Sequence, residues 1–471
     1  MKVLTANSKW FDKSDIRLDS SFHLSQGRLT KILLDKCPYG LTTIEKVSSS
    51  IFYGGRARRT YVDSEENGIP FIGSADMLKC SFEGLKYISK KTTKNLNSLF
   101  VKNEWILVSR SGTVGNTVFV NNDFHGKGAS EHIIRIVPNN VMTPGIIYSF
   151  LSSKYGYSLM TQGVFGAVIQ HIEPEFLANL PIPKFPDALQ EKAHLKIIEA
   201  SSLLVEANEL LINAQDFLMS SVALPPLSSE EYEYFGYHSA DRKLSAFSIS
   251  SSEISPVSIN AFNYSRRIKA LHKRVESATK GVSLADVLET PGFFSTGSFP
   301  RVELNSPKAI TLINQTDIFN IRKVGKQISP RKVKTDRLVC YGEVMIAGVG
   351  TLGENETFCR TIFAGEELEG QLVSGEFIRM KTKKGIPSGY LYAWLSSDYG
   401  FRFVRSTQTG TKLCRPIPAL LKNIPVPLLE ENEMKKIDAM VRKAHTKRFE
   451  ALKKEDEAIS MVENEISSWQ K

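Results

Sequence analysis

The side chains best suited to recognition chemistry in this chain are cations and amides on stretches with the composition of surface loops. An arginine can form two hydrogen bonds to O6 and N7 of guanine, a lysine more often contacts phosphate, and a glutamine amide fits the edge of adenine. Solvated charge or ordinary loop structure explains any one such residue equally well. Nucleic acid contact is therefore predicted for a set, which comprises Tyr53, Arg56, Arg58, Arg59, Arg110, Gln162 and Gln170 in the first half and Lys323, Lys326, Arg331, Lys332, Gln408, Lys412 and Arg415 in the second.

The sequence contains no recognisable set of catalytic residues. The Gly-Thr-x-Gly segments at 112–115 and 350–353 lack the GxxxxGK[ST] spacing of a phosphate-binding loop, so we interpret both as tight turns that need the backbone freedom of glycine. The chain has no Asn-Pro-Pro-Tyr or Asp-Pro-Pro-Tyr motif of amino-methyltransferases, and no HExxH, GxSxG or GxGxxG. Its five cysteines form no CxxC pair and no zinc spacing with a histidine. We expect no catalytic centre, no metal and no cofactor on this chain.

Composition narrows the class of protein. The chain has 471 residues, too many for a single core, and a formal net charge of +10 from 60 Lys and Arg against 50 Asp and Glu, which favours a polyanionic partner without proving one. Its 42% hydrophobic content is typical of a soluble folded protein, and no apolar run is long enough to suggest a membrane span. The first residues do not form a secretory signal. We therefore expect a cytoplasmic protein without membrane contact.

Three short motifs occur twice in the same order. The second set lies 238 to 244 residues after the first, and fainter matches such as Ile134-Arg135 with Ile378-Arg379 extend the correspondence. One domain has thus been duplicated within a single chain, and the length changes between the copies are expected in surface loops. The repeated motifs are Gly-Thr-x-Gly at 112–115 and 350–353, Leu-Ser-Ser-x-Tyr-Gly at 151–156 and 395–400, and Pro-x-Pro at 181–183 and 425–427.

A long helical pattern follows each Pro-x-Pro. After Pro183 the hydrophobic residues of one seam recur every seven residues with alanines between them, and a small residue at the seam lets a partner helix approach closely. The second pattern is less regular and predicts a register shift near Arg448. Antiparallel pairing of the two helices with each other is the simplest way to bury both stripes, although two unrelated surface helices remain an alternative. The predicted seam residues are Ile197, Leu204, Leu211 and Leu218 with Ala200, Ala207 and Ala214, and then Leu452, Ile459 and Ile466.

These patterns predict an α+β protein. Two tandem mixed α/β domains are each followed by a long α-helix, and the two helices pair as an antiparallel coiled coil. The expected strands include 105–108 and 344–347, and the expected short helices include 146–151 and 390–395. The expected boundaries are an N-terminal extension at 1–16, the first domain at 17–186, the first helix at 187–222, a connector at 223–258, the second domain at 259–429 and the second helix at 430–471.

Taken together, the repeated motifs and the two helices resemble the specificity subunit of type I restriction-modification systems, over residues 17–471. That family has two target-recognition domains, each followed by a helix, in the same order. The resemblance implies a subunit without catalysis that reads a bipartite target in double-stranded DNA. It also implies that the helices dock two modification (methyltransferase) subunits, that restriction (motor-nuclease) subunits join the complex, and that S-adenosylmethionine and ATP bind only to those partners. The segment 163–166 departs from the family-like Thr409-Gly410-Thr411 of the second copy.

Two other functions remain open from the sequence alone. A coiled-coil assembly protein with two protein-binding globular domains would explain the repeats and the helices but not the basic loops. A self-sufficient methylating or nucleolytic enzyme is disfavoured because the motifs of such enzymes are missing. The identity of the target bases does not follow from the sequence, because side-chain identity on a loop does not determine its docking pose.

Overall fold

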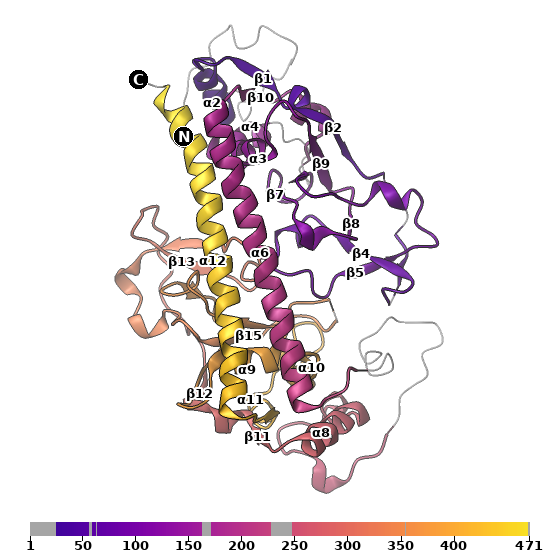
Figure 1. Cartoon of the computed structure of the whole chain (residues 1–471). Coiled ribbons are helices and arrows are strands. Elements are labelled where there is room, and N and C mark those ends of the chain that lie inside the picture. Colours follow the sequence, from indigo (N-terminus) through magenta and orange to yellow (C-terminus); the bar gives the residue numbers. More distant parts are fainter. Residues whose placement is uncertain are drawn as a thin grey trace. The chain divides into compact units, whose positions relative to one another are not determined.

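The computed structural model describes residues 25–55, 59–62, 64–162, 171–227, 247–353 and 355–469 (Figure 1). The chain divides into two compact units, here called unit 1 (Met1–Val205 with Glu450–Lys471) and unit 2 (Glu206–Phe449). Each unit contains one globular domain and half of each long helix. The expected extension at 1–16 and the middle of the expected connector lie outside the described residues.

Unit 1 is built on a four-stranded antiparallel sheet in the order β2-β9-β6-β7. A second sheet has the order β3-β5-β4-β8, and the pair β1-β10 closes the domain before the long helix begins. The strands are β1 (Leu41–Thr43), β2 (Ser48–Tyr53), β3 (Tyr61–Val62), β4 (Gly68–Ile72), β5 (Lys86–Ser89), β6 (Ile106–Ser109), β7 (Thr117–Phe119), β8 (Gly128–Ala129), β9 (Ile133–Pro138) and β10 (Pro181–Pro183). The helices of this domain are α2 (Gln26–Leu34), α3 (Pro144–Ser152), α4 (Lys154–Gln162) and α5 (Pro174–Ala178).

Unit 2 repeats the main sheet of this plan, with one strand fewer in its second sheet and an additional β19–β20 pair. Its main sheet has the order β12-β18-β15-β16, its second sheet has the order β14-β13-β17, and β11 pairs with β21 as β1 pairs with β10. The strands are β11 (Gly281–Ser283), β12 (Leu288–Phe294), β13 (Ile310–Ile313), β14 (Lys326–Ile328), β15 (Val344–Ala347), β16 (Thr361–Phe363), β17 (Leu372–Val373), β18 (Phe377–Thr382), β19 (Gln408–Thr409), β20 (Arg415–Pro416) and β21 (Pro425–Pro427). The helices are α8 (Arg266–Ala278), α9 (Ser388–Ser396), α10 (Asp398–Ser406) and α11 (Pro418–Leu421). The duplication inferred from short motifs is therefore a duplication of the fold.

The repeated Leu-Ser-Ser-x-Tyr-Gly motif forms a corner between two helices in each domain. Ser153 lies between α3 and α4, and its hydroxyl oxygen accepts a hydrogen bond from the amide of Gly156 at 3.2 Å. Ser397 and Gly400 repeat this contact at 3.2 Å between α9 and α10. A Cβ atom on either glycine would lie 2.1 Å from a carbonyl oxygen of the preceding helix, so only glycine fits. The motif recurs because the serine caps the new helix and the glycine allows the close approach.

The long helices α6 (Asp187–Val222) and α12 (Glu431–Ser468) pack side by side in antiparallel directions within each unit. In unit 1, Lys196 forms an ion pair with Glu457, and Lys454 Nζ lies 2.9 Å from Glu199 Oε1. In unit 2, residues further along α6 again contact residues earlier in α12, as antiparallel packing requires. Lys447 Nζ lies 2.5 Å from Glu206 Oε2, and Lys436 Nζ lies 3.9 Å from the centre of the Phe217 ring. The predicted antiparallel pairing is observed inside both units.

The seam of α6 is the predicted one, with alanine at its most buried positions. Ala200, Ala207 and Ala214 are at most 4% exposed, Ile197 and Leu218 are also buried, and Leu204 and Leu211 are half-buried. A seam of alanines brings two helix backbones close together, because no long side chain separates them.

The seam of α12 differs from the prediction. Ala451 and Ala458 are buried, whereas Leu452 and Ile459 are only half-buried beside them; Ile466 is buried as expected. Buried positions continue from Val441 and Ala444 to Ala451 and Ala458 with the alternating three and four spacing of a heptad. The expected register shift near Arg448 was therefore wrong. The larger leucine and isoleucine suggested the stripe, but the small alanines face the partner helix.

Candidate nucleic-acid interface

In the first domain the fold brings the Gly-Thr-x-Gly turn against the end of the loop that follows α4. Ser111 and His171 form an isolated β-bridge, and Ser111 Oγ lies 2.7 Å from His171 Nδ1. Gly112 and Gly115 have φ values of 81° and 90°, which L side chains rarely adopt, so the prediction of a glycine-dependent tight turn is confirmed here. The rest of the loop, including the predicted Gln170, lies outside the described residues.

Arg110, which precedes this turn, is buried in the domain. It is 3% exposed, its Nη2 donates to Glu173 Oε1 at 2.5 Å, and its guanidinium lies 4.5 Å from the centre of the Tyr53 ring. An arginine engaged in this way positions the turn and the β2 strand end instead of projecting toward a ligand. Gln162, at the end of α4, is 5% exposed. These two residues were predicted to contact DNA, but the structure gives them places inside the protein because their partners come from distant parts of the chain.

Among the described residues of this domain, Arg59 is a predicted DNA-contacting cation that lies at the surface. Its Nη2 lies 2.6 Å from Glu131 Oε2, and its guanidinium lies 5.2 Å from the centre of the Phe71 ring. Burial alone would raise the pKa of Glu131, but the hydrogen bond from Arg59 lowers it overall, so the pair is ionic at neutral pH. Arg56 and Arg58 lie outside the described residues.

In the second domain the corresponding loop is a β-hairpin formed by β19 and β20. Gly350 and Cys414 exchange two backbone hydrogen bonds, of 3.2 and 2.7 Å, so this hairpin abuts the second Gly-Thr-x-Gly turn as His171 abuts the first. Gly350 does not have a positive φ. It is required because a Cβ atom would lie 2.9 Å from Cβ of Phe358, which corrects the expectation of two equivalent tight turns.

The hairpin exposes cations and buries the amide that was predicted to read bases. Lys412 and Arg415 are exposed, and Leu413 between them is 61% exposed. Gln408 is only 2% exposed, and its carbonyl oxygen accepts hydrogen bonds from Asn263 Nδ2 at 3.0 Å and Asn260 Nδ2 at 3.5 Å. Gln408 therefore anchors the hairpin, and Lys412 and Arg415 are the predicted residues that it exposes to solvent.

The basic stretch from 323 to 334 lies beside the second sheet of unit 2. Arg331 and Lys332 are exposed on a short 3-10 helix, Pro330–Lys332. Lys326, on β14, pairs with Glu303 at 2.6 Å, and both side chains are more than 60% exposed. Lys323 is half-buried and donates to the carbonyl oxygen of Asn320. A surface pair of this kind contributes little stability and exchanges readily for another anion.

Sequence reasoning missed the acidic partners of the predicted cations. Glu131, Glu173 and Glu303 neutralise Arg59, Arg110 and Lys326, respectively. Each lies 23 to 72 positions from its cation, so no local pattern reveals the pairing.

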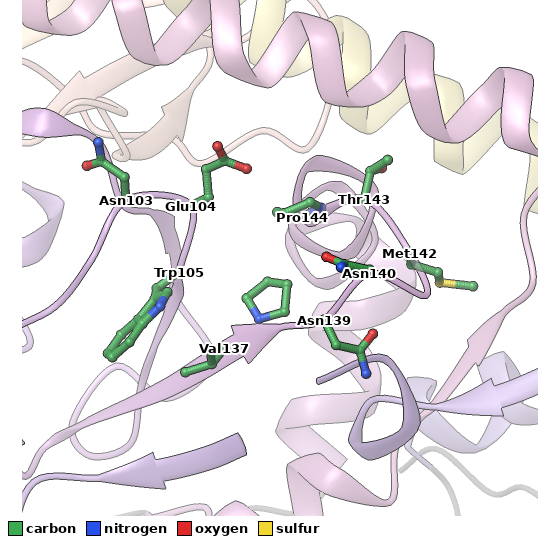
Figure 2. Close-up of a pocket in the computed structure, with 10 residues that line it drawn as sticks. Asn103, Glu104, Trp105, Val137, Asn139, Asn140, Met142, Thr143 and Pro144 are labelled. Atoms are coloured by element: carbon green, nitrogen blue, oxygen red, sulfur yellow. The ribbon is translucent and has the colours of Figure 1, made fainter. Parts of the chain in front are cut away.

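A hollow at the start of α3 has a volume of about 480 Å³. Figure 2 shows Asn103, Glu104 and Trp105 on one side of it and Asn139, Asn140 and Pro144 on the other. One carboxylate among amides does not form an acid-base pair. Among the described residues no cluster of three or more His, Cys, Asp or Glu could hold a metal ion. No helix in the described part of the chain is long and apolar enough to cross a membrane.

Comparison with known proteins places the first domain in a family. Residues 50–214 match the model of the type I restriction modification DNA specificity domain. No curated protein matches the chain. Matching solved structures include a type I restriction-modification S subunit from M. genitalium (13% identity, TM-score 0.30, 92% of this chain and 96% of that chain) and the HsdS subunit of Thermoanaerobacter tengcongensis (12% identity, TM-score 0.27, 92% and 96%). A third comes from a study of complex assembly and conformational transition of the type I R-M system (13% identity, TM-score 0.27, 91% and 98%).

The likeness of the first domain to this family rests on the sequence match. The match runs from β2 through most of α6, so it includes the main sheet, the Gly-Thr-x-Gly turn and the first long helix. Residues 50–214 of this chain, which form most of the first domain and of α6, are therefore similar to the type I restriction modification DNA specificity domain.

Proposed function

We propose that this chain is the DNA-recognition subunit of a type I restriction-modification complex and that it reads a target made of two short halves separated by unspecified bases. The observation that carries the proposal is the match of residues 50–214 to the DNA specificity domain, together with the repeat of the order of the main sheet in unit 2. A second domain with the same main sheet, the same helix corner and a following helix is the natural reader of a second half-site.

Each domain is proposed to read DNA with the loops around its Gly-Thr-x-Gly turn. In unit 2 these are the exposed Lys412 and Arg415 of the β19–β20 hairpin, with Arg331 and Lys332 as further contacts. In unit 1 Arg59 is the exposed candidate, with Arg56, Arg58 and Gln170 as predictions outside the described residues. Arginine at the tip of a hairpin suits the major groove, which admits a two-stranded ribbon.

The chain is further proposed to have no catalysis of its own. Methyl transfer would come from two modification subunits docked on the paired helices, and cleavage from restriction subunits. S-adenosylmethionine and ATP would bind to these partners. The support for this division of labour is the family of the first domain and the missing catalytic motifs of the sequence.

Genome-wide methylation mapping tests the proposal. The chain is expressed with its cognate modification subunit in a host that lacks both, and the host with the modification subunit alone is the control. The expected result is methylation, present only with this chain, at a motif of two short halves whose centres lie about 10 bp apart, one helical turn. A continuous, ungapped motif would contradict the proposal.

Binding to duplex DNA separates this function from a protein-assembly role. A DNA reader loses affinity steeply with salt because each neutralised phosphate releases counterions, with a slope of about 0.9 per contact. A coiled-coil assembly protein with two protein-binding domains would show no such binding. Detectable methylation or cleavage by the purified chain alone would point instead to a self-sufficient enzyme.

A further inference from the structure

The most basic helix of unit 2 was not among the predicted DNA contacts. Helix α8 has the sequence RRIKALHKRVESA over 13 residues, with five Lys or Arg and one Glu. Its N-terminus is capped by Ser265, whose hydroxyl accepts from the amide of Ile268. The helix is strongly amphipathic, so its charges are confined to one side.

Burial shows which side that is. Ile268, Leu271 and Val275 are buried against the domain core. Arg266, Ala270 and Lys273 are exposed on the opposite side, where residues three or four apart are neighbours. Lys269, also on this side, is half-buried and pairs with Glu253 at 2.6 Å. The outer face of α8 therefore keeps an excess of positive charge.

The equivalent helix of unit 1 has a different surface. Helix α2 begins after Ser25, which caps it as Ser265 caps α8, and the two serines correspond in the repeat. Its exposed side carries Leu29 at 50% and Ile32 at 37% exposure. The two duplicated domains thus differ at this position: α2 exposes leucine and isoleucine while its cations Arg28 and Lys31 are half-buried, whereas α8 exposes Arg266 and Lys273. Since the fold is the same in both, the charge of α8 is not a requirement of folding.

The short helix that leads into α8, Ala261–Tyr264, is hydrogen-bonded to the base of the predicted DNA-reading hairpin. This short helix supplies Asn263, whose Nδ2 donates to the carbonyl oxygens of Ser406 at 2.5 Å and Gln408 at 3.0 Å. Ser406 ends α10, and Gln408 begins the hairpin that exposes Lys412 and Arg415. The cations of α8 and those of the hairpin therefore belong to one neighbourhood of unit 2.

We infer that the outer face of α8, with Arg266 and Lys273, binds the phosphate backbone beside the second half-site and holds the hairpin in register on the DNA. The inference rests on the proposed function and adds an asymmetry to it, because α2 offers no such contact. A helix of 13 residues is about 20 Å long, and phosphates of one strand lie about 3.4 Å apart along the axis, so α8 spans several of them. Contacts of this type position a protein without reading bases.

Salt-dependent binding of the full chain tests the inference. The probe is a mixed-sequence duplex of about 30 bp, three helical turns, and affinity is measured by fluorescence anisotropy between about 50 and 200 mM salt. The double variant R266Q/K273Q should lower the slope of log K against log salt by about 1.8, that is 0.9 for each lost phosphate contact. The matched control K383Q/K384Q removes two exposed lysines from the turn before α9 and should leave the slope unchanged.

A gain-of-charge variant tests the same face without removing anything. Ala270→Lys places a cation between Arg266 and Lys273 and should steepen the slope by about 0.9. An unchanged slope in both α8 variants, with salt-dependent binding by the wild-type chain, would overturn the inference, leave the proposed function intact and assign the basic face to an acidic protein partner. Failure of the wild-type chain to bind the duplex would instead defeat the proposed function itself.

Discussion

Arg379 and Glu343 form a bidentate ion pair in the interior of the second domain. Arg379 Nε lies 2.8 Å from Glu343 Oε2, Arg379 Nη2 lies 3.0 Å from Glu343 Oε1, and both side chains are 1% exposed. The guanidinium also donates to the carbonyl oxygens of Arg337 and Leu338, each at 2.7 Å. The pair joins β18 to the turn before β15 and to the segment that follows the basic stretch.

For the corresponding arginine of the first domain, no ion pair with a carboxylate is found among the described residues. Arg135 is fully buried and donates to four carbonyl oxygens, among them Ser130 at 3.1 Å and Ile133 at 2.8 Å. Burial lowers the pKa of Arg135 to about 10, so it stays protonated at neutral pH. The two copies thus keep the same cation at the same place in the sheet but balance its charge differently.

Removing Arg379 should destabilise unit 2 strongly. Arg379→Met leaves Glu343 buried without its cation, which costs about 3–5 kcal/mol in comparable sites. Lys381 also faces Glu343, at 3.7 Å, but is 43% exposed, so Lys381→Met should cost no more than about 1 kcal/mol. Urea unfolding of the full chain, with hydrogen exchange of peptides from β15 and β18, measures both. Equal losses in the two variants would show that the buried pair is not the stabilising contact.

Because α6 and α12 pack closely, we predict that the alanines of the seam cannot be replaced by larger residues without loss of stability. Ala207 is fully buried in the seam of unit 2, so Ala207→Leu should cost about 1–3 kcal/mol because a larger side chain pushes the helices apart. Ala439→Leu is the matched control, since it makes the same change at an exposed position of α12 and should have almost no effect. Thermal unfolding followed by circular dichroism measures the difference. A seam that accepts leucine at Ala207 without loss would contradict the close packing.

Stability of unit 2 should depend on pH through His445. This side chain is 5% exposed at the α12 seam, and it faces Glu367 at 3.9 Å and the cations Lys323 and Arg448. Burial lowers the pKa of His445 despite the opposing effect of Glu367. The unfolded chain therefore binds the proton more readily than the folded chain. The contribution of His445 is fully present above its ordinary pKa near 6.5 and is lost as the pH falls below it.

His445→Phe should weaken that pH dependence. The urea midpoint of the wild-type chain is expected to fall between pH 7 and pH 5, and the variant should lose less over the same range. It should not become independent of pH, because burial also lowers the pKa of His272 in the same unit. An identical loss in the wild-type chain and the variant would show that His445 does not take up its proton in this range.

The sequence predicted the features that depend on local pattern. The first long helix was expected at 187–222 and spans Asp187–Val222, because a heptad repeat and a preceding Pro-x-Pro define it from within the segment. The short helices expected at 146–151 and 390–395 are also present, within Pro144–Ser152 and Ser388–Ser396. The duplication could be predicted because both copies kept the same short motifs in the same order.

What the sequence could not predict depends on partners far along the chain. In the sequence, Arg110 and Arg59 both look like cations on exposed loops. In the structure, Arg110 is buried against Glu173 and the Tyr53 ring. Leu452 and Ala451 both fit a helical stripe, and only the facing helix decides that alanine lies in the seam. Gln408 was expected to contact adenine through its side-chain amide, but it is buried beside Asn263. Candidate base contacts therefore need the fold as well as residue type.

Arg415 provides the sharpest test of base reading in the second domain. It is exposed on β20, next to the tip of the hairpin, where a guanidinium can form two hydrogen bonds to one guanine. Arg415→Ala should therefore relax one position in one half of the methylated motif, at a cost of about 1–3 kcal/mol for that base. The other half and the gap should stay as they are, because they depend on unit 1 and on the helices.

Mapping the motif of Arg415→Ala against that of Lys412→Ala distinguishes reading from positioning. Lys412 lies on the same hairpin but carries a point charge suited to phosphate, so its loss should lower methylation evenly at all sites without changing the motif. If Arg415 instead contacted phosphate, its variant would behave like Lys412→Ala, with weaker methylation and an intact motif. A motif altered in both halves would mean that the two domains do not read their half-sites independently.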